Sequence, residues 1–325
     1  MPCTFQLVEV YTPMQTRYMG VLLLLGALWG ASFLFIKIGV AEMPPATLVA
    51  IRLAVGSAIL LGVLYARGLR MPNKLRAWGD MFFVGIIGTV VPYMLITWGE
   101  QHITSGMASI LNATMPLFTV LLTYVWTREE RLNGLRLFGV LLGFVGVVVA
   151  VGVEHLSLTA ADTQGQLAVL LASLCYAITG IYARRAFRGM PALIPATGQM
   201  LTGAIIIVPI ALLGYGIPSP LPSPLALGAV LALAVFGTAI AYILLYWLLE
   251  RIGAARNSMV TYLLPPFALL YGALFLRESI TIETVLGLGL VIVGILLANG
   301  LIKLQSASQR RAALAEATAA CQGEV

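Results

Sequence analysis

Charged side chains are scarce in this chain of 325 residues, where they make up 10% of the sequence against 60% for hydrophobic residues. A soluble domain usually carries roughly 25% charged residues. This composition therefore cannot supply the surface of a water-exposed domain. The net charge of +6 comes from basic residues dispersed in short segments between apolar runs, so it does not indicate nucleic-acid binding.

Cysteine and histidine are also rare. Cys3, Cys175 and Cys321 are odd in number and far apart, and they form neither a disulfide framework nor a metal-ligand spacing. The two histidines, His102 and His155, fall between apolar runs, and the sequence has no HExxH pair and no GxxxxGK[ST] phosphate loop. These absences argue against an intramembrane enzyme and a primary pump. We predict no catalytic residue, metal or cofactor.

Hydrophobic runs about 20 residues long, the length that crosses a hydrocarbon layer of ~30 Å, follow one another along most of the chain. They predict an all-α polytopic membrane protein, because a transmembrane barrel would show short alternating segments. The first 17 residues lack an apolar core, so no cleavable signal peptide is predicted there. The ten predicted spans are residues 18–40, 46–66, 77–98, 104–126, 134–153, 165–187, 193–215, 225–249, 256–276 and 283–302.

A pattern of residues in the middle of the sequence recurs about half a chain later, at an offset of 149 residues. Residues that are uncommon here fall in register, which indicates an internal duplication rather than chance similarity between apolar helices. The matched pairs are Gly88-Thr89 with Gly237-Thr238, Tyr93 with Tyr242, Trp98 with Trp247, Ser109 with Ser258, Pro116 with Pro265, and Arg128-Glu129 with Arg277-Glu278.

Each copy holds five spans, an odd number, so the second copy enters the membrane from the opposite face. Such inverted repeats are found in many secondary transporters, with the substrate near the midplane between them. The predicted domains are an N-terminal segment 1–17, a first five-helix repeat 18–153, an external connector 154–164, a second five-helix repeat 165–302 and a tail 303–325.

Lysine and arginine lie almost entirely on one side of the predicted topology. With a cytoplasmic N-terminus, 16 of the 19 basic residues fall in cytoplasmic segments. Arg277 lies on the other side, and Lys37 and Arg52 lie inside predicted spans. Because cytoplasmic loops carry such an excess, we predict that both ends of the chain are cytoplasmic.

Two spans contain central prolines, Pro116 in the fourth and Pro265 in the ninth. A proline within a helix removes a backbone hydrogen bond, and helices interrupted at matching places in two repeats point to a binding site. A packing kink without ligand contact is the alternative. Asn112 and Thr261 lie one turn before these prolines, where each can bond a freed carbonyl or a substrate.

Arg52 lies inside the second span, and its repeat counterpart is Gln199. A cation inside a span is costly and should face the bundle interior or a polar cavity. Arg52 either anchors a substrate carboxylate or is structural, bonding helix-end carbonyls or snorkelling to the surface. The residues predicted to bind substrate and line the cavity are Arg52, Tyr93, Asn112, Pro116, Tyr176, Gln199, Tyr242, Thr261, Tyr262 and Pro265.

No acidic residue lies deep in a predicted span, although proton-coupled carriers commonly place a titratable acid in the pathway. The candidates for a mouth or coupling role are Lys37, Glu100 and Asp80. Lys37 is expected to snorkel or to tune the outer mouth, while Asp80 and Glu100 lie at the two ends of the third span. The pattern favours an uncoupled facilitator or coupling through a mouth residue such as Glu100.

Several motifs occur together: Leu28-Trp29-Gly30-Ala31-Ser32-Phe33, Lys37, Arg52, Pro116 and Arg128-Glu129. Together with the duplication they resemble the EamA-type exporters of the drug/metabolite transporter superfamily, over residues 18–302. The resemblance implies ten helices in two inverted five-helix repeats. It also implies export of amino acids or other small metabolites from the cytoplasm, across the inner membrane in bacteria.

In the second repeat Cys175-Tyr176 replaces Trp29-Gly30, so the two halves need not contribute equally to the site. The predicted function is a secondary exporter of amino acids or related metabolites, working by alternating access at a midplane cavity. The alternatives are a uniporter or channel-like facilitator, a multidrug exporter and, last, an intramembrane enzyme. The expected partners are a small-molecule substrate and the lipid bilayer, with no nucleic acid and with a monomer as the oligomeric state.

Overall fold

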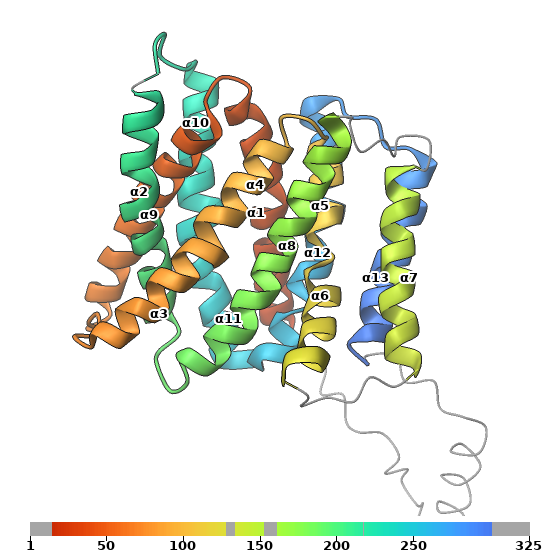
Figure 1. Ribbon diagram of the computed structural model, residues 1–325, viewed down its shortest axis with the longest axis horizontal. Coiled ribbons are helices and arrows are strands. Elements are labelled where there is room, and N and C mark those ends of the chain that lie inside the picture. The colour runs from red at the N-terminus through yellow and green to blue at the C-terminus, as the bar shows by residue number, and fades with distance from the viewer. Residues whose placement is uncertain (1–14, 128–133, 153–160, 217, 301–325) are drawn as a thin grey trace, which may run out of the picture.

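The computed structural model describes residues 15–127, 134–152, 161–216 and 218–300, and in this part of the chain all regular elements are helices (Figure 1). They are α1 Thr16–Val40, α2 Pro45–Ala66, α3 Leu75–Gly85, a π-helical segment Ile86–Val90, α4 Val91–Gly99, α5 Ser105–Asn112, α6 Met115–Leu122, a π-helical segment Thr123–Thr127, α7 Gly134–Val151, α8 Ala161–Ala186, α9 Leu193–Tyr215, α10 Pro224–Ala232, a π-helical segment Leu233–Ile240, α11 Ala241–Asn257, α12 Val260–Leu276 and α13 Ile282–Ala298.

These elements group into ten spans. Eight continuous stretches are long and apolar enough to cross a membrane, with α3–α4, α5–α6 and α10–α11 each forming one of them. The two shorter apolar helices, α12 and α13, have 17 residues each. At a rise of about 1.5 Å per residue, each of these reaches roughly 25 Å. The prediction of an all-α membrane protein with ten spans is confirmed.

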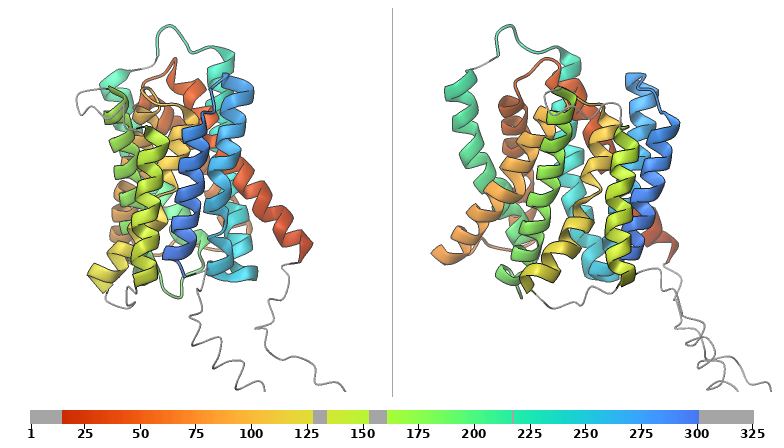
Figure 2. Two further views of the ribbon diagram at one scale, coloured as in Figure 1. Left: turned by 90° about the vertical axis from the view of Figure 1, so that its right-hand side faces the viewer. Right: turned by 45° about the vertical axis from the view of Figure 1, so that its right-hand side comes forward.

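The two repeats run in opposite directions. The start of α1 and the end of α13 lie at the same end of the bundle, which we call the N-terminal face, and the other end is the opposite face (Figure 2). Since five spans precede α8, it starts at the opposite face, whereas its counterpart α1 starts at the N-terminal face. The contacts share this symmetry: α1 packs on α12 of the other repeat, and α8 packs on α5 and α6.

Helices α7 and α13 form a closely packed pair at one edge of the bundle (Figure 1). Glycines bring the two backbones together: a Cβ atom built on Gly294 would lie 2.5 Å from the backbone nitrogen of Gly143. Small residues allow such close approach of helices in a membrane. The glycines of this tightly packed region are Gly139, Gly143, Gly146, Gly287 and Gly294.

The central prolines do not act alike. In span four α5 ends at Asn112 and α6 starts at Met115, with Pro116 in its first turn, where a missing N–H costs nothing. The hydroxyl of Ser173 on α8 donates to the Leu111 carbonyl, at 3.1 Å, near this break. In span nine, however, α12 continues through Pro265. The predicted interruption at both matching places therefore holds for the first repeat only.

The repeats share another irregularity, which the sequence pattern did not predict. The π-helical segments Ile86–Val90 and Leu233–Ile240 contain the repeated Gly88-Thr89 and Gly237-Thr238 pairs. Single π turns within α-helices are frequent at functional sites. Here each one lies in the third span of its repeat, and the second presents Thr238 to the bundle interior, where it is fully buried.

Candidate functional site

A cavity of about 400 Å³ lies between the two repeats. Its volume is at the lower end of the range of about 300–1,000 Å³ that is usual for small-molecule sites. Helices of both repeats contribute to it, including α1, α2 and α4 from the first and α8, α11 and α12 from the second. The lining residues are Trp29, Ser32, Phe33, Ile36, Arg52, Tyr93, Ile96, Asn112, Met115, Tyr176, Tyr242, Leu245, Leu249, Asn257, Ser258, Val260, Thr261 and Leu264.

Arg52 is the charged residue of this lining. Its side chain points into the bundle and is 6% exposed. The Nε atom donates to the Thr238 hydroxyl at 3.0 Å, and the guanidinium carbon lies 3.7 Å from the centre of the Tyr93 ring. A cation over an aromatic face is attracted by the ring quadrupole. Arg52 is thus fixed by its Nε and its flat face, which leaves the fork of its terminal nitrogens as donors for an anion.

Two carboxamide oxygens complement this cation. The Oδ1 atoms of Asn112 and Asn257 are buried and accept no hydrogen bond from the residues that the structure describes. The Asn257 Nδ2 donates to the Leu245 carbonyl at 3.3 Å, which links the last residue of α11 to an earlier part of the same helix. Buried acceptors without partners are uncommon because they cost free energy. In a cavity they can be satisfied by the N–H groups of a bound molecule.

Aromatic rings form one wall of the cavity. Trp29 of α1 and Tyr242 of α11 meet edge to face, with ring centroids 6.2 Å apart, and Tyr242 lies 6.1 Å from Tyr246. Tyr176 of α8 lines the cavity on another helix. Such rings offer a large apolar surface with polar tips. The cavity therefore combines one cation, unpaired acceptors and an apolar wall.

The cavity reaches towards the N-terminal face. Leu249 and Ser258, close to the turn between α11 and α12, line it there, and Ser258 is exposed. Their repeat counterparts near the opposite face are Glu100 and Ser109, which are 0% and 1% exposed. The same positions are thus open in the second repeat and closed in the first.

Two carboxylates connect the repeats at the closed, opposite face. Glu278, after α12, accepts hydrogen bonds from the Ser105 N–H at 2.9 Å, the Ser105 hydroxyl at 2.8 Å and the Gly106 N–H at 3.2 Å. Glu42, after α1, accepts from the N–H and hydroxyl of Ser223 at 2.6 and 2.7 Å. Each carboxylate binds at the N-terminus of a helix of the other repeat, α5 or α10, where negative charge is favoured.

The predicted site residues divide into two groups. The structure brings Arg52, Tyr93, Asn112, Tyr176, Tyr242 and Thr261 together around the cavity. Four others are not among the residues that line this cavity: Pro116, Gln199, Tyr262 and Pro265. Substrate binding by any of these residues stays a prediction.

The local structure around each of these four residues differs from that of the cavity wall. Pro116 and Pro265 are taken up by helix structure, in the first turn of α6 and within α12. The hydroxyl of Tyr262 accepts a hydrogen bond from Asn299, at 3.2 Å, and so is directed to α13. Gln199 lies on α9, where its backbone carbonyl accepts from Thr202 at 3.2 Å.

Two of the three mouth candidates, Lys37 and Glu100, meet near the end of α4, and Asp80 lies elsewhere. The Lys37 ammonium donates to the Glu100 and Ile103 carbonyls, at 2.5 and 2.7 Å. Asp80 accepts a hydrogen bond from Tyr182 at 2.6 Å, which links α3 to α8.

Glu100, at the residue that follows α4, is fully buried rather than solvated at a mouth. Burial raises the pKa of its carboxyl well above the usual value. Lys37 opposes this shift, Glu278 adds to it and Arg52 opposes it.

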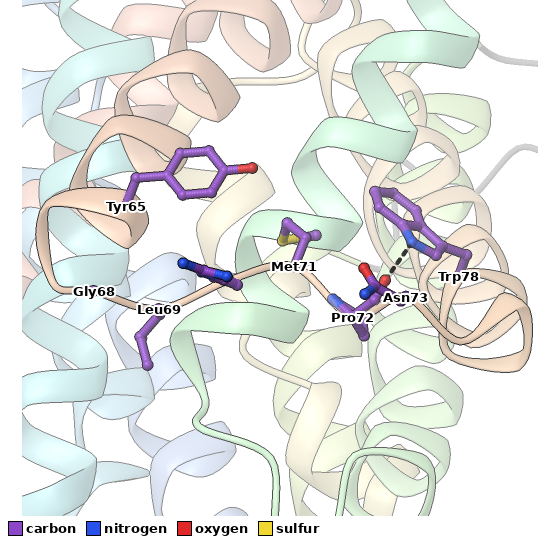
Figure 3. A pocket seen from close by; sticks show the side chains of 8 residues that line it. Tyr65, Gly68, Leu69, Met71, Pro72, Asn73 and Trp78 are labelled. Atoms are coloured by element: carbon purple, nitrogen blue, oxygen red, sulfur yellow. Dashed lines mark hydrogen bonds between the residues drawn. The ribbon is translucent and has the colours of Figure 1, made fainter.

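A second hollow, of about 700 Å³, lies at the N-terminal face between the end of α2 and the start of α3 (Figure 3). The Trp78 indole donates to the Pro72 carbonyl at 2.8 Å and holds the connecting loop in place. All of its lining residues come from this loop and the two helices that it joins, whereas both repeats enclose the central cavity. We therefore take the central cavity as the candidate site.

Sequence patterns did not predict the polar residues of the second repeat that line the cavity, Asn257 and Ser258. Their signal was present: both lie at the start of the predicted ninth span, and Ser258 is the repeat counterpart of Ser109. Polar residues at the end of a span are normally expected at the membrane surface rather than in a central cavity.

Known proteins give a consistent picture. The model of the EamA-like transporter family matches residues 17–152 and 163–300. An uncharacterized transporter YoaV of Bacillus subtilis is 25% identical over 268 residues, which cover 82% of this chain and 91% of that protein. The uncharacterized inner membrane transporter YedA of Escherichia coli K12 is 26% identical over 279 residues, which cover 86% of this chain and 89% of that protein. A crystal structure with 19% identity, covering 89% of this chain and 98% of that chain, matches with a TM-score of 0.63 and so has the same fold.

Proposed function

The chain belongs to the EamA-like transporter family of the drug/metabolite transporter superfamily, and on this premise we propose that it exports amino acids or related small metabolites by alternating access. It is a multi-pass membrane transporter. The direction, the substrate class and the mechanism are the proposal. The observation that carries it is the presence of Arg52, Asn112 and Asn257 in the lining of one cavity, where the Oδ1 atoms of both asparagines are buried without a partner in the described structure.

This arrangement suits a zwitterion. A carboxylate can accept the terminal N–H groups of Arg52 in a charge-assisted pair. An ammonium group can donate to the two carboxamide oxygens, which supplies the partners that they lack. The aromatic wall then takes an apolar side chain. A cavity of about 400 Å³ suits a single small molecule of this kind rather than a polymer.

The direction of export rests on the distribution of charge. The basic residues favour a cytoplasmic N-terminal face, so the cavity would face the cytoplasm with the opposite face closed by Glu278 and Glu42. Two inverted repeats give two similar packings, open to opposite sides. When the protein switches from the packing that is open to the cytoplasm to the one that is open at the opposite face, the substrate would be released outside.

Efflux from vesicles tests the proposal. Proteoliposomes with the purified protein are loaded with a mixture of radiolabelled amino acids, and the loss of each is followed against protein-free vesicles. Saturable efflux of at least one amino acid that Arg52→Gln abolishes is the expected result. Absence of amino-acid flux, together with efflux of cationic dyes, would favour the multidrug exporter. A flux that does not saturate would favour the channel-like facilitator.

Orientation has its own test. Reporter domains fused to either end of the chain should both be protected from protease added outside intact cells, and both digested after permeabilisation. Digestion of either one in intact cells would refute the cytoplasmic placement and with it the proposed direction.

A further inference from the structure

Glu100 is a buried acid that the proposed transport cycle does not yet use. Its side chain is 0% exposed, and neither carboxyl oxygen has a hydrogen-bond partner among the residues that the structure describes. The side chain lies at the closed end of the bundle, near enough to Lys37, Glu278 and Arg52 for their charges to act on it. A charged carboxylate without partners is very unfavourable in such a place, whereas a neutral acid is tolerated.

The neighbouring charges do not remove this cost. Lys37 of α1 faces Glu100, but its ammonium is bound to the backbone carbonyls of Glu100 and Ile103. Arg52 of α2 also faces it, and Glu278, which follows α12, repels a negative charge here.

The remaining neighbours are the loop that follows α4 and helix α8. In the loop, His102 packs on Trp98 with ring centroids 4.8 Å apart. Helix α8, also packed on α4, presents the apolar Val169 near Gly99. Two cations and one acid thus act on a carboxyl that bonds to none of them in the described structure.

The matching position in the second repeat indicates where Glu100 would lie when the closed face opens. Its counterpart is Leu249, which lines the open half of the cavity. Ser109 is buried in the same closed half, and its counterpart Ser258 is exposed. In the alternating access proposed above, Glu100 would take the place that Leu249 has now, in contact with water at the opposite face.

We propose that Glu100 is a proton-binding site, and that it binds a proton when the opposite face closes and releases it to water at that face when the face opens. The proposal rests on the alternating access proposed above. No bond other than the carboxyl O–H forms or breaks, and the proton comes from and returns to bulk water. Because the second repeat has Leu249 at the matching place, only the closing of the opposite face is linked to a proton in this way.

Thermodynamic linkage gives the direction in which pH changes the population of the open state. The closed state binds the proton more tightly, so raising the pH favours the open state. The pH range over which this linkage acts extends upward from the ordinary pKa of a solvated carboxyl to the raised pKa of Glu100 in the closed state. At a pH between the Glu100 pKa values of the open and closed states, one linked proton changes the open population by up to about tenfold per pH unit.

Two matched cysteine substitutions read out the two faces. Ser109→Cys and Ser258→Cys change repeat-related serines and are made in a chain in which Cys3, Cys175 and Cys321 are replaced. Each protein is placed in lipid nanodiscs, so that both faces see the same pH, and its labelling rate with a charged maleimide is measured between about pH 5 and 8. Each rate is divided by the rate of the same protein unfolded in detergent at that pH, which removes the titration of the thiol.

The expected result is a corrected labelling rate that rises with pH in the Ser109→Cys protein and falls with pH in the Ser258→Cys protein. When Glu100→Gln is added, or Glu100→Leu, which copies the second repeat, the rates should no longer change with pH. Glu283→Gln is the control, since Glu283 is an exposed acid on the first turn of α13 at the same face. It should retain the wild-type response.

Three outcomes would overturn the proposal. A pH response that survives in both Glu100 variants assigns the proton to another group. Labelling of the Ser109→Cys protein that is independent of pH while Glu100 is intact removes the proton link and leaves alternating access in place. Absence of labelling of the Ser109→Cys protein at every pH, even after Glu278→Ala, shows that the opposite face does not open, and alternating access then fails together with the proton site.

Discussion

The guanidinium carbon of Arg52 lies 3.7 Å from the centre of the Tyr93 ring, so a cation from α2 covers an aromatic face from α4 within one repeat. The Thr238 hydroxyl of the other repeat holds the same side chain by its Nε atom. Arg52 thus joins the two repeats at the wall of the cavity. Both contacts fix the direction in which the terminal nitrogens point, and an anchor for an anion needs such a fixed direction.

The first prediction concerns the ring beneath Arg52. Tyr93→Leu removes the cation–π contact, worth about 2 kcal/mol or more when desolvated, and should raise the KM for an exported amino acid at least about tenfold. Tyr93→Phe keeps the ring and should keep most of the affinity. The measurement is the concentration dependence of efflux from proteoliposomes. Equal losses in both variants would show that the hydroxyl, not the ring, matters.

A second prediction separates binding from stability at Asn112. Its Oδ1 is buried without a partner in the described structure, so Asn112→Ala removes an unsatisfied acceptor and should leave the Tm unchanged or raised. Transport should fall, because the substrate loses an acceptor. Thr114→Ala is the contrast, since its hydroxyl donates to the Leu111 carbonyl at 2.6 Å and its loss should lower the Tm. A drop in the Tm of Asn112→Ala would make Asn112 structural.

The spans and the duplication could be predicted because they depend on properties that the sequence carries locally. Apolar runs of membrane length define helices whatever their neighbours. Uncommon residues in register, such as Trp98 with Trp247, reveal the repeat. A cation within an apolar run must face the interior, which is where Arg52 lies.

The rest depends on which of two conformations the repeats adopt. Ser109 and Ser258 are equivalent in the sequence, yet one is buried and the other exposed, since only one end of the cavity is open. Gln199 is equivalent to Arg52 but lies outside the cavity lining. Equivalent positions in an inverted repeat have unequal surroundings in any one state. A pattern of residues cannot say which of the two is open.

The third prediction tests the packing of α7 against α13. A Cβ atom on Gly287 would lie 2.5 Å from the backbone nitrogen of Ala150, so the backbone must move to accept one. We expect Gly287→Ala to cost about 1–3 kcal/mol of stability, as overpacking usually does. Gly289→Ala, two residues further along α13, meets nothing within 4 Å and should be neutral. The midpoint of thermal unfolding in detergent compares the two, and equal midpoints would refute the close contact.

The last prediction concerns the Glu278 contact that closes the opposite face. Its carboxylate accepts three hydrogen bonds from Ser105 and Gly106 across the repeat boundary. Hydrogen bonds to a charged group are worth about 1.5–3 kcal/mol each, so Glu278→Ala should favour opening by about tenfold or more, at about 1.4 kcal/mol per factor of ten.

The labelling rate of the Ser109→Cys protein reports this change. It should rise in Glu278→Ala at a pH where Glu100 is protonated, while Glu278→Gln, which can still accept hydrogen bonds, should show a smaller rise. Glu42→Ala removes the other contact at this face, with Ser223, and since that contact is exposed its effect should be weaker. A Glu278→Ala rate equal to that of the protein with Glu278 intact would mean that apolar packing, rather than this carboxylate, holds the face closed.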